Sequence, residues 1–171
     1  MLPWLFASPA LAADVPTDAA SKQAYAALKP VVSPVEWETA DRAIDRSRLR
    51  AVDPELGRRA DAMPLPVLLP ADPELARSAR FWHGSGWVVV ELSDGAMNIV
   101  IHATNHGSVL PAPPAPVSFT STMVDGIHTL AFTRFGVHYA LDVTCPTPTP
   151  CLSDAAAREL WNGLEAIGGR P

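Results

Sequence analysis

Lysine is scarce in this chain of 171 residues, which has only Lys22 and Lys29, so arginine supplies most of its 13 basic side chains. With 18 acidic residues and a net charge of −5, the composition argues against a nucleic-acid partner. No segment approaches the ~20 apolar residues of a spanning helix, so we expect no membrane span in the mature protein. Only two cysteines are present, but a chain of this length can form a core without a metal or many disulfides.

Several enzyme motifs are also missing. The glycine-rich segments lack the spacing and the lysine of a phosphate-binding loop, so nothing supports nucleotide binding. Ser85 lies in Gly84-Ser85-Gly86, which lacks the Gly-x-Ser-x-Gly of a nucleophile elbow, and we expect no strand before it. We therefore interpret this segment as a loop and predict no catalytic residue.

Two histidines come closest to the sequence pattern of a metal site. His102 and His106 have a His-x-x-x-His spacing, but that spacing converges on a metal only within a helix. Here we expect His102 in a strand and His106 in the turn after it. A zinc site would need a third ligand, for which His138, Asp142 or Glu91 could serve. The spacing is not diagnostic, and we predict neither a metal nor another cofactor.

The first residues have the features of a secretory signal. Leu2 to Phe6 is a short apolar core, and Ala10-Leu11-Ala12 fits the small-residue rule for cleavage. We predict a signal peptide over residues 1–13 and a periplasmic or secreted protein. No basic residue precedes the apolar run, which departs from the usual pattern and favours a start further upstream. The alternative is a mature N-terminal strand or anchor.

The two cysteines agree with export. Cys145 and Cys151 bracket Pro-Thr-Pro-Thr-Pro, a stiff bend that fixes φ at three positions. Two cysteines close in sequence in an exported chain predict one structural disulfide. A redox-active pair usually has the Cys-X-X-Cys spacing, which this is not. The bridge would join the last strand to the start of the C-terminal helix.

We divide the remaining chain into an N-terminal helical segment, residues 14–62, and an α+β domain, residues 63–171. Helices are expected over 18–29 and, from a capping box at Ser33-Pro34-Val35-Glu36, to about residue 51. Asp53-Pro54 and Asp72-Pro73 should each begin a short helix. Residues 63–70 are apolar but proline-rich, which predicts an extended or edge segment.

From residue 87 the hydrophobic period changes to two. Asp94-Gly95 and Asp125-Gly126 predict tight hairpins, the first pairing Leu92 with Met97 and the second pairing Val124 with Ile127. A turn at Phe135-Gly136 adds a third pairing. The turns at 125–126 and 135–136 both assign the same side chains to one face of the sheet: Phe119, Met123, Leu130, Phe132, Tyr139, Leu141 and Val143.

An amphipathic helix from residue 154 to about Ile167 should pack on that apolar face. The predicted fold class is α+β, with a five-stranded antiparallel meander sheet packed by the C-terminal helix. The segment FTRFGVHYALDVTC, with a second cysteine and a helix after it, resembles a pattern in small exported bacterial proteins of uncharacterised function. The resemblance covers about the last third of the chain, carries no known active site and implies only export and this fold.

The other face of the sheet is rich in threonine and histidine. As a candidate binding surface we take six of its residues: Trp87, His102, Thr129, Thr133, His138 and Asp142. Trp82 and Phe81 lie nearby in sequence, and clustered aromatic side chains are enriched at interfaces. The alternative is a solvated face, for which threonine is suited. It stays open whether the N-terminal helices cover this face.

These features favour an exported, non-enzymatic binding or accessory module of the cell envelope, with an envelope protein or a glycan as its partner. A second hypothesis is a small exported hydrolase or metal-dependent enzyme that uses His102, His138 and Asp142. A third is a structural subunit whose N-terminal helices dock on a larger complex.

Overall fold

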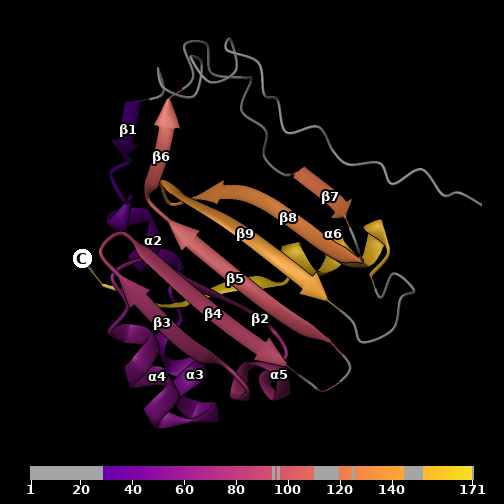
Figure 1. Ribbon diagram of the computed structural model, residues 1–171. Coiled ribbons are helices and arrows are strands. Elements are labelled where there is room, and N and C mark those ends of the chain that lie inside the picture. The colour runs from indigo at the N-terminus through magenta and orange to yellow at the C-terminus, as the bar shows by residue number, and fades with distance from the viewer. Residues whose placement is uncertain are drawn as a thin grey trace, which may run out of the picture.

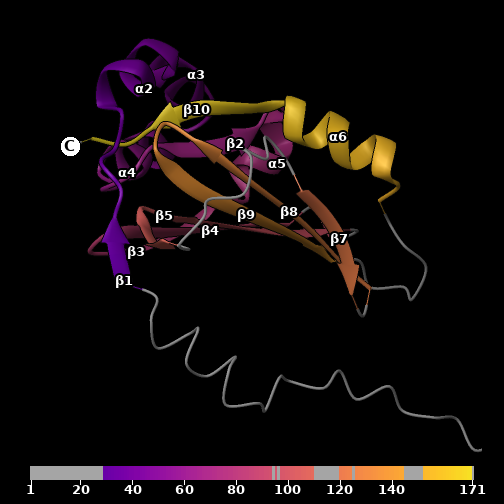
Figure 2. The ribbon, with the colours of Figure 1, turned by 90° about the horizontal axis from the view of Figure 1, so that it is seen from above.

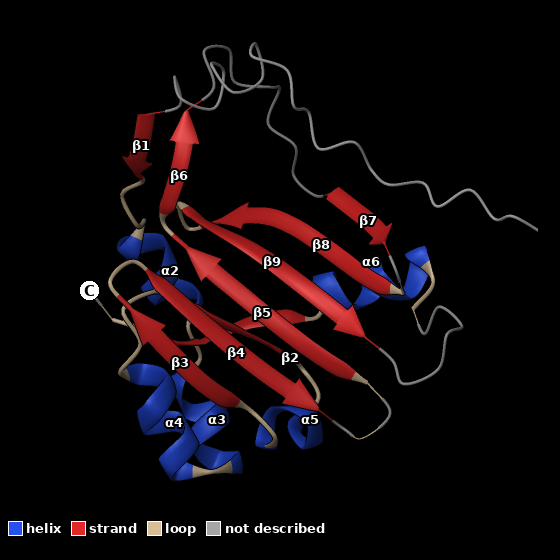
Figure 3. Cartoon of the chain, viewed as in Figure 1, coloured by secondary structure: helices blue, strands red, loops and turns tan. Residues whose placement is uncertain are grey.

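The structure is a computed structural model that describes residues 29–93, 95, 97–109, 120–124, 126–144 and 152–170. The predicted signal peptide, the first predicted helix up to residue 28, Phe119, Cys145 and Cys151 lie outside these residues, so the signal and the disulfide stay predictions. The fold is mixed α+β, as predicted, with a six-stranded sheet in front of a group of helices (Figures 1 and 3).

The sheet is antiparallel throughout, and its order is β3-β4-β5-β9-β8-β7. Its strands are β3 (Arg80–Gly84), β4 (Trp87–Ser93), β5 (Asn98–Thr104), β7 (Thr120–Val124), β8 (Ile127–Arg134) and β9 (Val137–Thr144). The predicted five-stranded meander is wrong on two counts. β3 adds a sixth strand, and β9 rather than β7 lies beside β5.

The burial of the strands explains this order. On β9 every second side chain is buried, with Val137, Leu141 and Val143 fully enclosed. On β7 the side chains of Ser121 and Met123 are exposed, although Met123 was predicted in the apolar face. Burial stabilises an apolar strand most when the strand lies in the centre of a sheet, whereas an exposed polar strand is tolerated at an edge.

The hairpin turns at Asp125-Gly126 and Phe135-Gly136 both have the predicted registers. Met123 lies opposite His128, and Phe132 lies opposite Tyr139. Phe135 and Gly136 have φ of 56° and 73°, as a two-residue type I′ turn requires. The alternation of the flanking strands and the turn residues therefore specify the same register here.

The register of the β4–β5 hairpin differs from the prediction by two residues. Leu92 pairs with Ile99 rather than Met97, because Ser93 pairs with Asn98 and the loop between them has four residues. The longer loop leaves Met97 partly buried at the rim and places Ile99 in the core. A shift of two residues leaves every side chain on its predicted face.

A second, two-stranded sheet lies against the main one. β2 (Val67–Pro70) pairs antiparallel with β10 (Leu164–Gly168). The predicted helix to Ile167 is therefore wrong, because α6 (Asp154–Asn162) ends at Gly163. All four residues of β2 are buried, since this ribbon lies between the sheet and the helices and is covered on both faces (Figure 2).

A buried tyrosine joins the main sheet to the chain that leads into β2. The hydroxyl of Tyr139 donates to the Pro66 carbonyl oxygen over 2.8 Å. Burial raises the pKa of this phenol, so the hydroxyl stays protonated and keeps its donor role well above neutral pH. Its ring stacks on Phe132, and Phe132 meets the ring of Trp161 on α6 edge to face.

Four short helices come from the N-terminal part and from the chain after β2. They are α2 (Trp37–Ala43), α3 (Arg46–Val52), α4 (Pro54–Asp61) and α5 (Pro73–Arg77). The single predicted helix to residue 51 is broken at Asp45, whose carboxylate caps α3 by accepting from the backbone N–H groups of Ser47 and Arg48. The Ser33–Glu36 capping box does not form, since Glu36 is the N-cap and makes no side-chain cap bond. The caps at Asp53 and Asp72 are confirmed.

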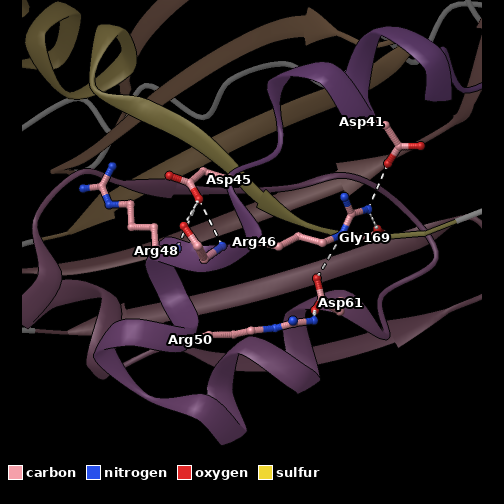
Figure 4. A network of polar contacts seen from close by, with 8 residues as sticks. Asp41, Asp45, Arg46, Arg48, Arg50, Asp61 and Gly169 are labelled. Atoms are coloured by element: carbon pink, nitrogen blue, oxygen red, sulfur yellow. Dashed lines mark hydrogen bonds and ion pairs between the residues drawn. The ribbon is translucent and has the colours of Figure 1, made fainter.

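Arginine side chains hold these helices to the end of β10. Arg46 contacts Asp41 and Asp61 and donates to the Gly169 carbonyl oxygen over 3.1 Å, and Arg50 also pairs with Asp61 (Figure 4). Because the Arg46 and Arg50 side chains are more than a third exposed, each pair adds little stability. The network nevertheless fixes α2, α3 and α4 around one strand end.

The described helices and the β2–β10 ribbon all lie on one side of the main sheet (Figure 2). Ala40, Leu49 and Leu56 of the helices belong to the same hydrophobic core as the inner face of the sheet. No described helix covers the other face. This answers the question that the sequence left open for α2, α3 and α4, which pack on the apolar side; the first predicted helix lies outside the described residues. A further pair of strands, β1 (Lys29–Val32) and β6 (His106–Val109), extends beyond one end of the sheet (Figure 1).

Candidate functional site

The six predicted binding residues share the face of the main sheet that is turned away from the core and that no described helix covers, called the uncovered face below. They come from four neighbouring strands: Trp87 (β4), His102 (β5), His138 and Asp142 (β9), and Thr129 and Thr133 (β8). The strand registers arrange five of them in two cross-strand rows: Trp87, Thr104, His138 and Thr133 in one, and Glu91, Val100, Asp142 and Thr129 in the other. His102 lies between these rows, opposite Val89 and Ala140.

Two tryptophans lie at one side of this face. The side chains of Trp82 and Trp87 are 46% and 42% exposed, which is high for the largest apolar side chain. The indole of Trp87 lies across Gly84, where any Cβ would collide with the ring. Gly84 therefore lets this ring lie flat on the sheet. Phe81 does not contribute, because it is buried on the opposite face.

Hydrogen bonds connect the polar residues of the face. The hydroxyl of Thr129 donates to Asp142 Oδ1 over 2.6 Å, and His102 Nε2 lies 3.8 Å from Asp142 Oδ2. Thr133 Oγ1 lies 3.0 Å from His138 Nδ1. Imidazole, hydroxyl and carboxylate groups together offer both donors and acceptors to a ligand that lies on the sheet.

An open pocket of about 510 Å³ continues the face at one end. It is lined by Arg77, Ser78, Ala79, Arg80, Glu91, Ser93 and Asn98. Arg80 lies opposite Glu91 in the register, so charges of both signs line its wall. The pocket adds charged groups to the hydroxyl and imidazole groups of the two rows.

The alternative enzyme site is brought together only in part. His102 approaches Asp142, but His138 pairs with Thr133 instead. Within the part of the chain that the structure describes, no serine bonds to His102 or His138, whereas a catalytic triad needs its nucleophile on the base.

Two other candidates from the sequence, His106 and Ser85, are not part of the two rows. His106 opens β6 rather than a turn, and its ring packs against Gly86. Ser85 lies in the turn between β3 and β4, so a strand does precede it, contrary to the prediction. No group of three or more His, Cys, Asp or Glu side chains with the geometry of a metal site occurs among the described residues. Their helices also include none with the length and apolarity to cross a bilayer.

One polar pair was missed by the sequence analysis. His128 is the buried polar residue of the described core, 2% exposed, and its Nε2 lies 2.6 Å from Ser121 Oγ. The pair could have been found from the sequence, because the predicted register already placed Met123 opposite His128. Ser121 is then the diagonal neighbour of His128 on the same face.

Comparisons with protein-family models, curated proteins and solved structures found no match to this chain.

Proposed function

We propose that the protein is an exported binding module of the cell envelope and that the uncovered face of its main sheet binds the ligand. The observation that carries this proposal is the pair Trp82 and Trp87, both more than 40% exposed beside two rows of mostly polar side chains. Exposed aromatic groups of this size mark binding surfaces more often than plain solvated faces.

A glycan fits this face better than an apolar ligand. The tryptophan rings offer flat apolar surface to the C–H side of a sugar ring, while Thr133, His138 and Asp142 can exchange hydrogen bonds with its hydroxyl groups. A partner protein could use the same aromatic anchors and is the other possible ligand. The apolar start of the chain and the cysteine pair support the envelope as the compartment.

Trp82→Ala is expected to weaken binding to envelope glycan about fivefold or more, because truncating an aromatic anchor typically costs over about 1 kcal/mol. The measurement is co-sedimentation of the purified chain with insoluble peptidoglycan, together with titration against soluble glycan fragments. Trp82 is preferred over Trp87, because Trp87 also packs on the backbone of Gly84.

Met123→Ala is the matched control. Its side chain is 47% exposed, similar to Trp82, but it lies on edge strand β7 and points to the other side of the sheet. We expect no loss of binding in this variant. Equal losses in both variants would show that the tryptophan face is not the site. If the wild-type chain binds no glycan but cross-links to an envelope protein through this face, the ligand is a protein.

The export proposal is tested by the intact mass of the protein purified from its native host. We expect the first residues up to about Ala12 or Ala13 to be absent and the mass to be 2 Da lower than that of the reduced chain, as one disulfide requires. A protein that begins at Met1 and has two free thiols would contradict both the signal and the Cys145–Cys151 bridge.

A further inference from the structure

Ser121 and His128 lie on the opposite side of the sheet from the proposed binding face. Ser121 is on the edge strand β7 and His128 is on β8, as diagonal neighbours. The Ser121 side chain is exposed, whereas His128 is 2% exposed. A nucleophile open to solvent is thus held against a base that is enclosed by protein.

The second ring nitrogen of His128 has a partner that fixes the tautomer. Its Nδ1 lies 3.2 Å from the carbonyl oxygen of Leu152. A carbonyl oxygen can only accept, so Nδ1 carries the proton and the neutral ring has its lone pair at Nε2. Ser121 must then donate its hydroxyl proton to Nε2, which is the direction that activates a serine.

Neighbouring contacts hold Leu152 in place. Its side chain is buried, and the next residue, Ser153, is the N-cap of α6, accepting from the backbone N–H of Ala156 over 3.2 Å. The carbonyl of Leu152 therefore holds the imidazole ring in one orientation. It takes the place that a carboxylate has in a Ser-His-Asp triad.

We propose that Ser121 is a reactive nucleophile toward acyl and phosphonyl electrophiles, with His128 as its general base and the Leu152 carbonyl as the group that orients the ring. The predicted hydrolase used His102, His138 and Asp142, whereas the geometry points to this different pair. The inference goes beyond the proposed binding function and does not depend on it, because none of its three residues lies on the tryptophan face.

With an ester, the chemistry proceeds in two balanced steps. Ser121 Oγ bonds to the carbonyl carbon while its proton passes to His128 Nε2, and the bond to the alkoxy group breaks as that proton moves to the leaving alcohol. A water molecule then attacks the acylated serine, again giving a proton to Nε2, and releases the carboxylic acid and free Ser121.

A fluorophosphonate probe tests this reactivity on the full-length chain. Its phosphorus would bond to Ser121 Oγ, the P–F bond would break, and fluoride would leave with the hydroxyl proton. Peptide mass spectrometry with fragmentation measures the rate at each serine. We expect Ser121 to be labelled at least about 100-fold faster than Ser93, an exposed serine on β4, because general-base catalysis typically contributes that much.

Two variants complete the experiment. Ser121→Ala should abolish labelling in this strand, and His128→Gln should slow it about 100-fold while circular dichroism shows a retained fold. If His128→Gln does not fold, the wild-type comparison of Ser121 with Ser93 still decides. Equal labelling of these two serines, or wild-type labelling in a folded His128→Gln variant, would show that the pair only satisfies a buried histidine.

Discussion

Leu141→Ala is expected to lower the free energy of unfolding by about 2–5 kcal/mol, the range for truncating an enclosed leucine. Leu141 has no exposed surface, and it lies between Ile101 and Leu130 in the middle of the central strand β9. The rigid strands on either side cannot close the cavity that alanine would leave. Urea denaturation, with the midpoint and the slope both measured, gives the change.

Thr133→Ala is the control for this prediction, because Thr133 lies one strand away on the exposed face. Its hydroxyl contacts only the exposed His138, so we expect a change within about 0.5 kcal/mol. A loss as large as that of Leu141→Ala would mean that the uncovered face is buried by another part of the chain. Tolerance of both substitutions would contradict the register itself.

The sequence predicted the correct strand register at two of the three predicted hairpin turns. Asp125-Gly126 and Phe135-Gly136 both require positive φ at their central positions, and the alternating strands agree with them. At Asp94-Gly95 the alternation fits a two-residue and a four-residue loop equally well. In the fold Leu92 pairs with Ile99, which corresponds to the four-residue loop, and no local pattern contains that information.

The C-terminal strand shows a second limit. Leu164 and Ile167 continue the apolar stripe of α6, so a helix was the natural prediction. In the fold, β10 pairs with β2 and is enclosed between two layers, which favours an extended apolar run. The pairing of β5 with β9 is equally non-local, because about 35 residues separate the strands.

The candidate site was also predictable only in part, because the sequence shows the alternation of a strand but not the packing of distant elements. Alternation alone assigned Trp87, His102 and Asp142 to one face, and the register brought His102 to Asp142. That this face has no described helix over it depends on how the helices pack, which the sequence did not specify. Ser121 and His128 were adjacent in the predicted hairpin, but only the position of the Leu152 carbonyl gives the pair its tautomer.

Gly169→Ala is expected to lower the free energy of unfolding by about 2–6 kcal/mol, from two separate causes. Its φ of +111° is a conformation that an alanine adopts only at a cost of about 1–3 kcal/mol. A Cβ there would also collide with the Leu65 carbonyl oxygen and lie 2.9 Å from Pro66 Cα, and such overpacking costs about 1–3 kcal/mol more. The carbonyl of Gly169 also accepts from Arg46, so any shift of this backbone disturbs the arginine network.

Gly126→Ala separates these two causes. Gly126 has a similar positive φ of +79°, but nothing lies within 4 Å of the place where its Cβ would be. We expect this variant to lose only the conformational part, about 1–2 kcal/mol. Urea denaturation of both variants, with amide exchange in β10 as a second measurement, gives the comparison. If Gly169→Ala costs no more than Gly126→Ala, the end of β10 does not lie against Leu65 and Pro66, and the enclosed ribbon between sheet and helices would be wrong at that end.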